Sequence, residues 1–472
     1  KPQYSEDFNL HGRLAFYTNG KFENGWSLTA SADTREAPLD SIFSNFLNKS
    51  PEALFRRIDP DYHSPTFGDD STVMEDAPTS GKFYLKMKKD ETYGLWGNFR
   101  IAYTDTDLAH VDRGLYGANL HYQPLGTTSF GEPRLLVDGF AADPGTVAGR
   151  DELRGTDGSL YFLKRQDVLE GSERVRIEVR DKDSGIVLAV KNLTPALDYD
   201  IDYLQGRILL SQSLPATADD GLLVHSGSIS GHPVFLVVRY EFTPGFDAPD
   251  TLAAGGRAHY WFNDHVKLGV TASRDEESDI ESKLGGVDLT LRKSSESWLK
   301  LEAGRTEGPG VSATTSIDGG YSFAAPDSLD TSGVDAMAYR AEASLDFKDF
   351  FENGRGQVTF YIEDLEAGYS APGLTTDRDL TKYGAAAELP VTDRLSARLK
   401  VDKQEQHEGL RTETGELNID YKIGEHWTLG SGVRRDSRDD TSVDVPATQE
   451  EGERTDAAIR LLYDSSKRWT TY

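Results

Sequence analysis

The histidines and the clustered carboxylates are the side chains with which this chain could bind a metal ion or move a proton. There are 10 histidines, and no two of them lie at metal-ligand spacing with a third ligand beside them. His232, His259 and His265 fall on or near the ends of predicted strands, which suggests residues at a rim or in a lumen. One acidic stretch contains Asp59, Asp61, Asp69, Asp70 and Asp76. Calcium binds several such oxygens, but the spacing matches no known calcium loop, so a solvated loop is the simpler interpretation and no metal site is predicted.

Motifs for catalysis are missing from the sequence. It contains no glycine-rich phosphate loop, no nucleophile elbow and no HExxH sequence. Without any Cys, thiolate catalysis and thiolate metal sites are excluded. Asp200 and Asp202 share one strand face, but solubility explains that pair as well as catalysis does. We therefore expect no enzyme and no cofactor, although outer-membrane barrels with enzymatic activity exist.

Composition excludes several other classes of protein. The 79 acidic against 51 basic residues give a net charge of −28, which argues against nucleic-acid binding. Aromatic residues make up 10% of the chain, unlike a disordered acidic polypeptide. No run approaches the roughly 18 apolar residues of a membrane helix. Lys1-Pro2 shows no signal peptide, so the sequence is read as a mature, partial or cytoplasmic chain.

Period-two alternation of apolar and polar residues is the strongest pattern in the sequence. Leu417, Ile419 and Tyr421 share one face of a strand whose other face carries Asn418 and Asp420. Similar alternation recurs many times over about 9–13 residues, longer than ordinary strands and close to the roughly 9–11 residues of a membrane strand. Only residues 40–57 suggest helix. The pattern predicts an all-β protein, either a membrane barrel or a soluble sheet protein.

A repeated turn-plus-strand unit indicates a direction for these strands. Tight polar turns precede an apolar residue at Asn263–Val266, Ser295–Trp298, Thr392–Leu395, Gly424–Trp427 and Ser466–Trp469. Longer polar connections separate the hairpins, so short turns gather at one end and long loops at the other. Outer-membrane barrels have that asymmetry, with short periplasmic turns. Trp298, Trp427 and Trp469 then fall at the periplasmic interface, where an aromatic girdle is expected.

Together these patterns predict an antiparallel transmembrane β-barrel of about 18 strands, with a nineteenth beginning at Trp469. Residues 1–143 would form N-terminal barrel strands with a partly helical periplasmic segment at 36–80. Residues 144–231 would form an inserted small β-sandwich, and residues 232–472 the C-terminal hairpins. The predicted strand near 232–244 places the stem of the insert on the periplasmic side. There the insert is either a plug for the lumen or a periplasmic module.

Two short segments carry a resemblance to a known family. Leu197–Tyr203 with Gly206–Leu210, and the earlier stretch Pro60–Ser71, resemble elements of very large outer-membrane proteins that include the giant translocon of the Bacteroidetes secretion system. They cover under a tenth of the chain and imply no substrate. The order of barrel, insert and barrel is also similar to fimbrial ushers, by architecture alone.

The alternation assigns candidate side chains to two faces. Candidates for a wet lumen are Arg239, Glu241, Lys300, Glu302, Arg398, Lys400, Asp402, Asn418 and Asp420. Candidates for a lipid-facing surface are Leu289, Leu291, Leu299, Leu301, Leu417, Ile419 and Tyr421.

Three functions follow as hypotheses. The first is an outer-membrane channel or translocon that passes a polymer, protein or solute and is gated by the insert. The second is a non-transporting scaffold in an envelope assembly, and the third is a soluble all-β binding protein. Expected partners are outer-membrane lipid and, because the strand at Trp469 stops after four residues, further polypeptide beyond Tyr472 or another envelope protein.

Overall fold

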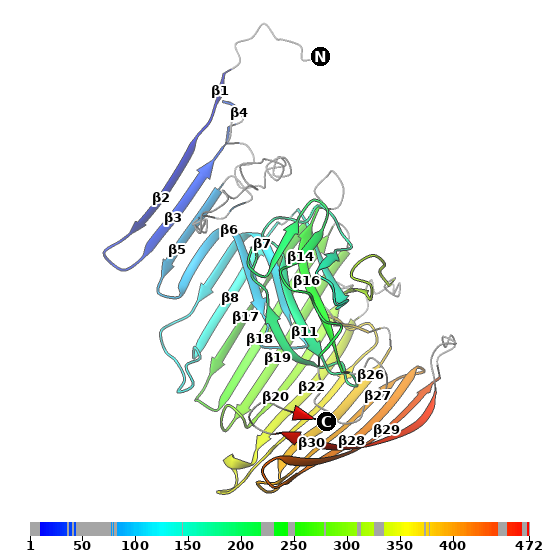
Figure 1. The fold of residues 1–472 in the computed structure, drawn as a ribbon. Helices are drawn as coiled ribbons and strands as arrows, with labels where there is room; N and C mark the ends of the chain where they lie inside the picture. The colour runs from blue at the N-terminus through cyan, green and yellow to red at the C-terminus, as the bar shows by residue number, and fades with distance from the viewer. Residues whose placement is uncertain are drawn as a thin grey trace.

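The computed structural model consists almost entirely of β-strands (Figure 1). It describes residues 10–34, 37–39, 42–43, 77, 79, 83–143, 145–218, 231–243, 251–277, 280–308, 313–324, 335–371, 374–376, 378–441, 451–464 and 470–471. Within these ranges no helix is long and apolar enough to cross a membrane. The predicted segment 36–80 lies mostly outside the described residues, and so do the stretch Pro60–Ser71 and Trp469.

One large antiparallel sheet, here called the barrel sheet, contains most of the strands. Each strand pairs with its neighbour in the order β2, β3, β5–β8, β17–β20, β22, β23 and β26–β31. Their bounds are β2 (Ala15–Lys21), β3 (Ser27–Asp33), β5 (Phe83–Lys89), β6 (Thr92–Tyr103), β7 (Val111–Tyr122), β8 (Leu135–Ala142), β17 (Thr251–Trp261), β18 (Val266–Glu277), β19 (Ile280–Arg292), β20 (Trp298–Glu307), β22 (Asp335–Asp346), β23 (Gln357–Leu365), β26 (Leu380–Pro390), β27 (Leu395–Gln406), β28 (Leu410–Ile423), β29 (Trp427–Asp440), β30 (Gly452–Asp464) and β31 (Thr470–Thr471). Within the described residues, β2 pairs with neither β30 nor β31. The expectation that further polypeptide pairs with the last strand stays a prediction.

The predicted barrel strand at 232–244 is wrong. β16 (His232–Phe242) pairs with β9 (Val147–Arg154) and β11 (Arg174–Arg180), outside the barrel sheet. β17 pairs instead with β8, so the two strands that flank the insert are direct neighbours. The error arose because a buried sandwich strand and a barrel strand share the same period of two. Residues 143–250, between β8 and β17, are called the insert below.

Removing β16 from the barrel moves the insert to the other end of the strands. The turns after β2, β5, β17, β19, β26 and β28 now lie at one end, the turn end. The long connections after β3, β20 and β29 lie at the opposite end, the loop end, and the insert leaves from that end too. The tight turn at Lys89–Thr92, which conflicts with the predicted strand count, now lies at the turn end. The connections after β18 and β27 are also short but lie at the loop end, so the predicted separation of short turns from long loops holds only in part. The predicted placement of the insert's stem at the short-turn end is therefore corrected.

The insert forms two small sheets with a core of their own. The first follows the order β12, β11, β16, β9, with β15 beside β16, and β21 from the connection after β20 joins it next to β9. The second follows the order β10, β14, β13. The remaining bounds are β10 (Leu160–Phe162), β12 (Val187–Asn192), β13 (Tyr199–Asp202), β14 (Arg207–Leu210), β15 (Thr217–Ala218) and β21 (Thr314–Ser316). Buried Leu153, Val175 and Leu236 of the first sheet and Tyr161 and Ile208 of the second belong to one hydrophobic cluster. That cluster holds the two sheets together.

Small elements complete the described chain. They are the pair β1 (His11–Gly12) with β4 (Ala37–Pro38), the pair β24 (Ser370–Ala371) with β25 (Leu374–Thr375), and the 3₁₀ turn η1 (Phe347–Asp349). η1 lies between β22 and β23 at the turn end. Asp346 caps it by accepting a hydrogen bond from the Lys348 N–H.

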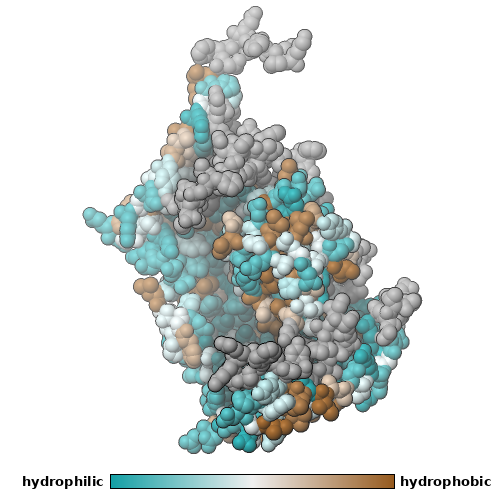
Figure 2. Space-filling view, in the orientation of Figure 1, coloured by the Kyte–Doolittle hydropathy of each residue, from teal (hydrophilic) through white to brown (hydrophobic). Residues whose placement is uncertain are grey.

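The two faces of the barrel sheet differ in exposure. Leu301, Leu417 and Tyr421 are exposed, whereas Glu302, Asp402 and Asn418 on the opposite face are buried. The insert lies against that second face, in front of β17–β22 in Figure 1. In Figure 2 the hollow beside the insert is lined mainly by hydrophilic side chains. The barrel sheet therefore has a hydrophobic outer face and a polar inner face, and the insert occupies the inner side.

Candidate functional site

The hairpin turn between β11 and β12 is shaped by its own side chains. The Asp181 N–H donates to the Ile186 carbonyl at 2.7 Å, and the Gly185 N–H to the Asp181 carbonyl at 2.9 Å. The Asp181 carboxylate accepts the N–H groups of Asp183 and Ser184, each at 2.9 Å. Gly185 has φ +72°, a conformation that glycine adopts without strain. The turn therefore holds two carboxylates, Asp181 and Asp183, in a fixed arrangement.

The barrel wall presents a row of charges opposite this turn. The register of β27, β28 and β29 places Lys400, Glu416 and Arg434 directly opposite one another. All three point to the inner face, because their parity is that of Asp402 and Asn418, which are buried there. The row alternates in sign, which is favourable for neighbouring cross-strand pairs.

The turn and the wall meet through four charged side chains, which we call the latch: Asp181 and Asp183 of the insert, and Lys400 and Arg434 of the wall. The Lys400 ammonium lies 2.6 Å from Asp181 and 2.9 Å from Asp183. Arg434 donates to Asp183 at 2.6 Å and also contacts Glu416 at 3.1 Å. The Asp181, Asp183 and Arg434 side chains are 5%, 8% and 5% exposed. The latch is therefore a buried ionic network rather than a surface ion pair.

Other groups around the latch complete its charge balance. Asp402 lies 3.2 Å from Lys400 and accepts a hydrogen bond from the Tyr361 hydroxyl at 2.7 Å. Asp436 contacts Arg434 at 2.7 Å, and the His232 Nδ1 lies 3.8 Å from Asp181. Oxygens of Asp181, Asp183 and Asp402 lie within 4.8 Å of one another, close enough to hold a cation. The Lys400 ammonium contacts all three carboxylates, so the protein supplies its own cation there.

The latch should weaken in acid. Burial alone would raise the pKa of Asp183, but the hydrogen bonds from Arg434 and the charges of Lys400 and Arg434 outweigh it and lower this pKa from 3.8 to about 2. The pKa of Asp181 is also lowered, since Lys400 outweighs the effect of burial. A carboxylate with a lowered pKa stabilises the docked state above its ordinary pKa and loses that contribution as pH falls through the docked value. For Asp183 that contribution is about 2 kcal/mol.

We therefore expect the insert to stay docked from pH 7 down to about pH 4 and to be released progressively toward pH 2. The measurement is single-channel conductance at stepped pH, with heat-modifiable gel mobility as the check that the barrel strands stay folded. Asp183→Asn should flatten the acid-dependent change. An unchanged pH profile in that variant would contradict the assignment.

A second contact ties the insert to β7. Arg113 donates to both oxygens of Glu241, at 2.9 and 3.0 Å, and Arg239 lies 2.9 Å from Asp112. Burial and the neighbouring Arg150 lower the pKa of Arg239 to about 9, so it still carries its charge at pH 7. A Cβ on Gly114 would lie 2.9 Å from the Ser172 Cα, so only glycine allows the backbones of β7 and the insert to approach this closely. The insert is thus fixed at β7 and at β27–β29.

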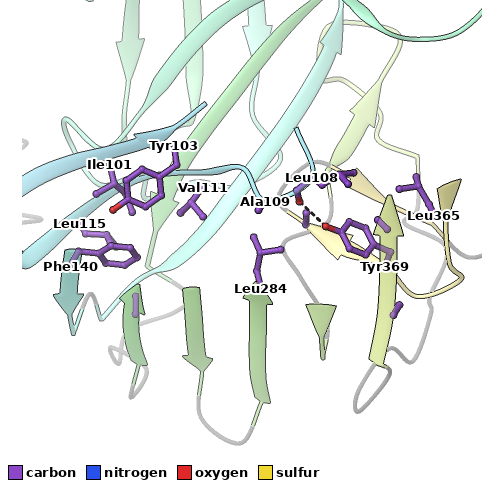
Figure 3. Close-up of a cluster of buried hydrophobic side chains, with 14 of the residues drawn as sticks. Ile101, Tyr103, Leu108, Ala109, Val111, Leu115, Phe140, Leu284, Leu365 and Tyr369 are labelled. Carbon is purple, nitrogen blue, oxygen red and sulfur yellow. Dashed lines mark hydrogen bonds between the residues drawn. The ribbon is translucent and has the colours of Figure 1, made fainter. Parts of the chain in front are cut away.

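Two connections at the loop end also fold onto the inner face (Figure 3). Glu302 accepts the N–H groups of Asp107 and Leu108 at 2.8 and 2.9 Å. The Tyr369 hydroxyl donates to the Leu108 carbonyl at 2.7 Å. Leu108 and Tyr369 belong to a buried hydrophobic cluster with Leu284 and Leu365 of the wall. Both connections are therefore anchored to the inner face of the wall.

The predicted lumen residues fall into four groups. Lys400 and Asp402 lie at the latch, and Glu302 binds the inward connection. Arg398 lies 3.4 Å from Asp420, Asn418 donates to Glu416 at 2.9 Å, and Lys300 lies over the Trp298 ring at 4.7 Å. Arg239 and Glu241 do not line the barrel wall: they belong to β16 of the insert and face β7. This corrects their assignment.

The predicted lipid-facing residues lie on the outer face. Leu289, Leu291, Leu299 and Ile419 are half-buried, and Leu301, Leu417 and Tyr421 are exposed. Trp427 opens β29 at the turn end and is exposed on the outer face. Trp298 opens β20 at the same end but has the strand parity of Lys300 and Glu302, so it faces the inner side, and its predicted place among the interface aromatics is corrected. Exposed Tyr122, Tyr260, Phe262 and Phe351 lie at that same end. Contact of these residues with lipid stays a prediction.

Sequence reasoning missed Asp181, Asp183, Glu416 and Arg434. Asp183-Ser184-Gly185 is recognisable as a turn, but nothing in the sequence connects Asp183 to Lys400, 217 positions away. The segment Leu197–Leu210, which resembles an element of the giant translocon, contains the hairpin of β13 and β14.

No family model matches the chain. No curated protein matches it either.

Solved structures similar to this chain are outer-membrane barrels at low similarity. OpdQ of Pseudomonas aeruginosa has a TM-score of 0.30 and 10% identity, over 96% of this chain and 90% of the other. The PapC usher translocation pore has a TM-score of 0.29 and 9% identity, over 96% and 81%. A ferric enterobactin receptor of Pseudomonas aeruginosa has a TM-score of 0.29 and 10% identity, over 98% and 71%. At these scores the fold must be argued from the chain itself.

Proposed function

We propose that this chain is an outer-membrane β-barrel conduit whose lumen is closed by the insert, held in place by the latch. A sheet with an apolar outer face and a charged inner face suits a bilayer around a wet lumen. Short turns face the periplasm in such barrels, so the turn end is periplasmic and the insert enters from the outer side. No cofactor and no catalytic step are part of this proposal.

One observation carries the proposal: the insert crosses the inner side of the sheet from one region of the wall to another. It leaves between β8 and β17 and contacts β7, and its far hairpin contacts β27 and β29. A domain that only rested at a rim would not need buried ion pairs on two separated regions of the wall. Buried ion pairs also allow the insert to be released from the wall, because loss of the charge on one partner strongly destabilises the docked state.

For the cargo, only a broad chemical class can be proposed. The finer resemblance to a giant translocon favours a polypeptide, and it stays a prediction. A polymer or a solute remains compatible with the geometry of the wall. Partners among envelope proteins, including a chain that pairs with the last strand, are part of the same proposal.

A non-transporting scaffold is the second candidate. The observation that favours it is the buried apolar cluster around Leu108 and Tyr369, which occupies part of the inner side. Unlike the ion pairs of the latch, this apolar packing is not weakened by a change in charge. A permanently filled barrel would anchor its surface loops without passing any cargo.

Excision of the insert distinguishes the gated conduit from the non-transporting scaffold. Replacing residues 144–249 by a short Gly-Ser linker should join β8 and β17 as a simple hairpin, because they are already paired. We expect a large, stable conductance in planar bilayers, where the unmodified chain is mostly closed. Heat-modifiable gel mobility checks that the excised barrel folds. A folded excised barrel with the low conductance of the parent would favour the scaffold.

A further inference from the structure

The outer edge of β12 is exposed along its whole length. Every residue of β12 is exposed, with Val187 at 43%, Leu188 at 52% and Val190 at 49%. β12 pairs with β11 on one side and ends the sheet on the other. Edge strands are normally protected by charges, proline or bulges, because their free backbone groups pair readily with other chains. β12 has Lys191, whose ammonium lies 3.6 Å from Asp198, and a bulge at Leu188, where Val179 pairs with Ala189 and Arg180 with Val187.

The backbone of β12 offers hydrogen-bonding groups away from its partner. The Leu193 N–H donates to the Val175 carbonyl of β11 at 2.9 Å. Residues of an antiparallel strand alternate between facing the partner and facing away. Lys191 therefore faces β11, and the N–H and C=O groups of Val190 and Asn192 point outward. The bulge at Leu188 lies before these two residues, so the pairing of Ala189–Asn192 with β11 is regular.

The opposite edge of the same sheet already receives a strand from outside the insert. β21, from the connection between β20 and β22, adds in parallel to β9, pairing Thr314 with Asp151 and Ser316 with Leu153. The sheet is thus built to be extended by an extended polypeptide segment, and one of its two edges is occupied by this chain itself.

We propose that the edge of β12 binds an extended polypeptide with apolar residues at alternate positions, which adds to the sheet as a strand. Main-chain hydrogen bonds from Val190 and Asn192 would give affinity, and the Val190 side chain would contact apolar side chains of the added strand. The inference rests on the proposed function and deepens it, because it makes a polypeptide the cargo. β12 begins directly after the latch turn, so one hairpin carries both the docking contact and the binding edge.

A peptide probe without charged residues tests this on the purified full chain in detergent. The probe is a heptapeptide, Thr-Val-Thr-Val-Thr-Val-Thr, with fluorescein on its N-terminus and an amidated C-terminus, read out by fluorescence polarisation. We expect saturable binding, at least tenfold weaker for the same peptide with proline at its central position. Hydrogen exchange should show the Val190 and Asn192 amides becoming protected when the probe is bound. Absence of binding, or protection elsewhere only, would overturn the proposal.

Two variants at one position provide the matched control. Val190→Pro removes the outward N–H without removing a bond to β11, whereas Val190→Thr keeps it. We expect at least a tenfold loss for the first and less than a threefold change for the second. If Val190→Pro fails to fold, Asn192→Pro makes the same test. Equal binding by the proline and threonine variants would overturn the proposal, as would peptide-independent dimers that the proline variant abolishes. Peptide binding to β12 is measured by fluorescence polarisation, whereas the proposed conduit is tested by conductance. A negative result in one experiment therefore does not decide the other.

Discussion

Lys400→Glu is expected to open the barrel. The Lys400 ammonium contacts Asp181, Asp183 and Asp402, and a glutamate there would add a fourth carboxylate to three that are buried. Removing one partner of a buried ion pair typically costs about 3–5 kcal/mol. If the closed state depends on the latch, that cost shifts the docking equilibrium by roughly a hundred- to a few thousandfold. Single-channel recordings should show the open-state probability rising accordingly.

Arg398→Glu is the matched control for this experiment. Arg398 lies on the same strand and the same face, two residues from Lys400, and undergoes the same change of charge. Its partner is Asp420 of the wall, at 3.4 Å. It should leave the barrel closed. Similar opening in both variants would show that lumen charge, and not the latch, controls conductance.

Leu399→Arg is expected to impair assembly in the bilayer. Leu399 lies on the outer face of β27 and is 45% exposed. An arginine on the lipid face costs roughly 2–4 kcal/mol at the bilayer midplane and less near the interfaces. We expect the free energy of unfolding in lipid vesicles to fall by that amount. It is measured from the folded fraction, seen by heat-modifiable gel mobility, as a function of urea concentration.

Ser396→Arg is the control, because it places the same side chain on the inner face of the same strand. Ser396 is exposed and paired with Asp420, which can accept the new charge. Its stability should change by under about 0.5 kcal/mol, as is usual for exposed substitutions. An equal loss at both positions would refute the assignment of the two faces.

The barrel sheet could be predicted from the sequence because alternation is a local property. Leu417, Ile419 and Tyr421 lie on one face in the structure, as any strand with their spacing requires. The same locality explains the error at β16. Val238 and Tyr240 alternate with Arg239 and Glu241 as in a barrel strand, and no local signal shows that β9 and β11 flank them. Counting one strand too many then reversed the side from which the insert enters.

The latch could not be predicted, because it is a contact between distant segments. Asp183 and Arg434 are separated by 251 positions. Each is an ordinary charged residue in its own segment, one in a turn and the other in an alternating strand. They meet only because the insert crosses the inner side of the sheet. The turn could therefore be predicted from the sequence, but its contact with the wall could not.

The insert's own ends lie side by side, and this bears on how the chain assembles. β9 and β16 open and close its first sheet, and Val147 pairs with Phe242. An unfolded connection of this length would raise the entropic cost of pairing β8 with β17 by roughly 3 kcal/mol relative to a short turn, at about 0.6 kcal/mol per doubling of length. Once folded, the insert presents its two ends as neighbours and acts like a tight turn. Early folding of the insert would therefore speed closure of the β8–β17 hairpin, and the segment that blocks the finished lumen would also set the order in which the wall is built.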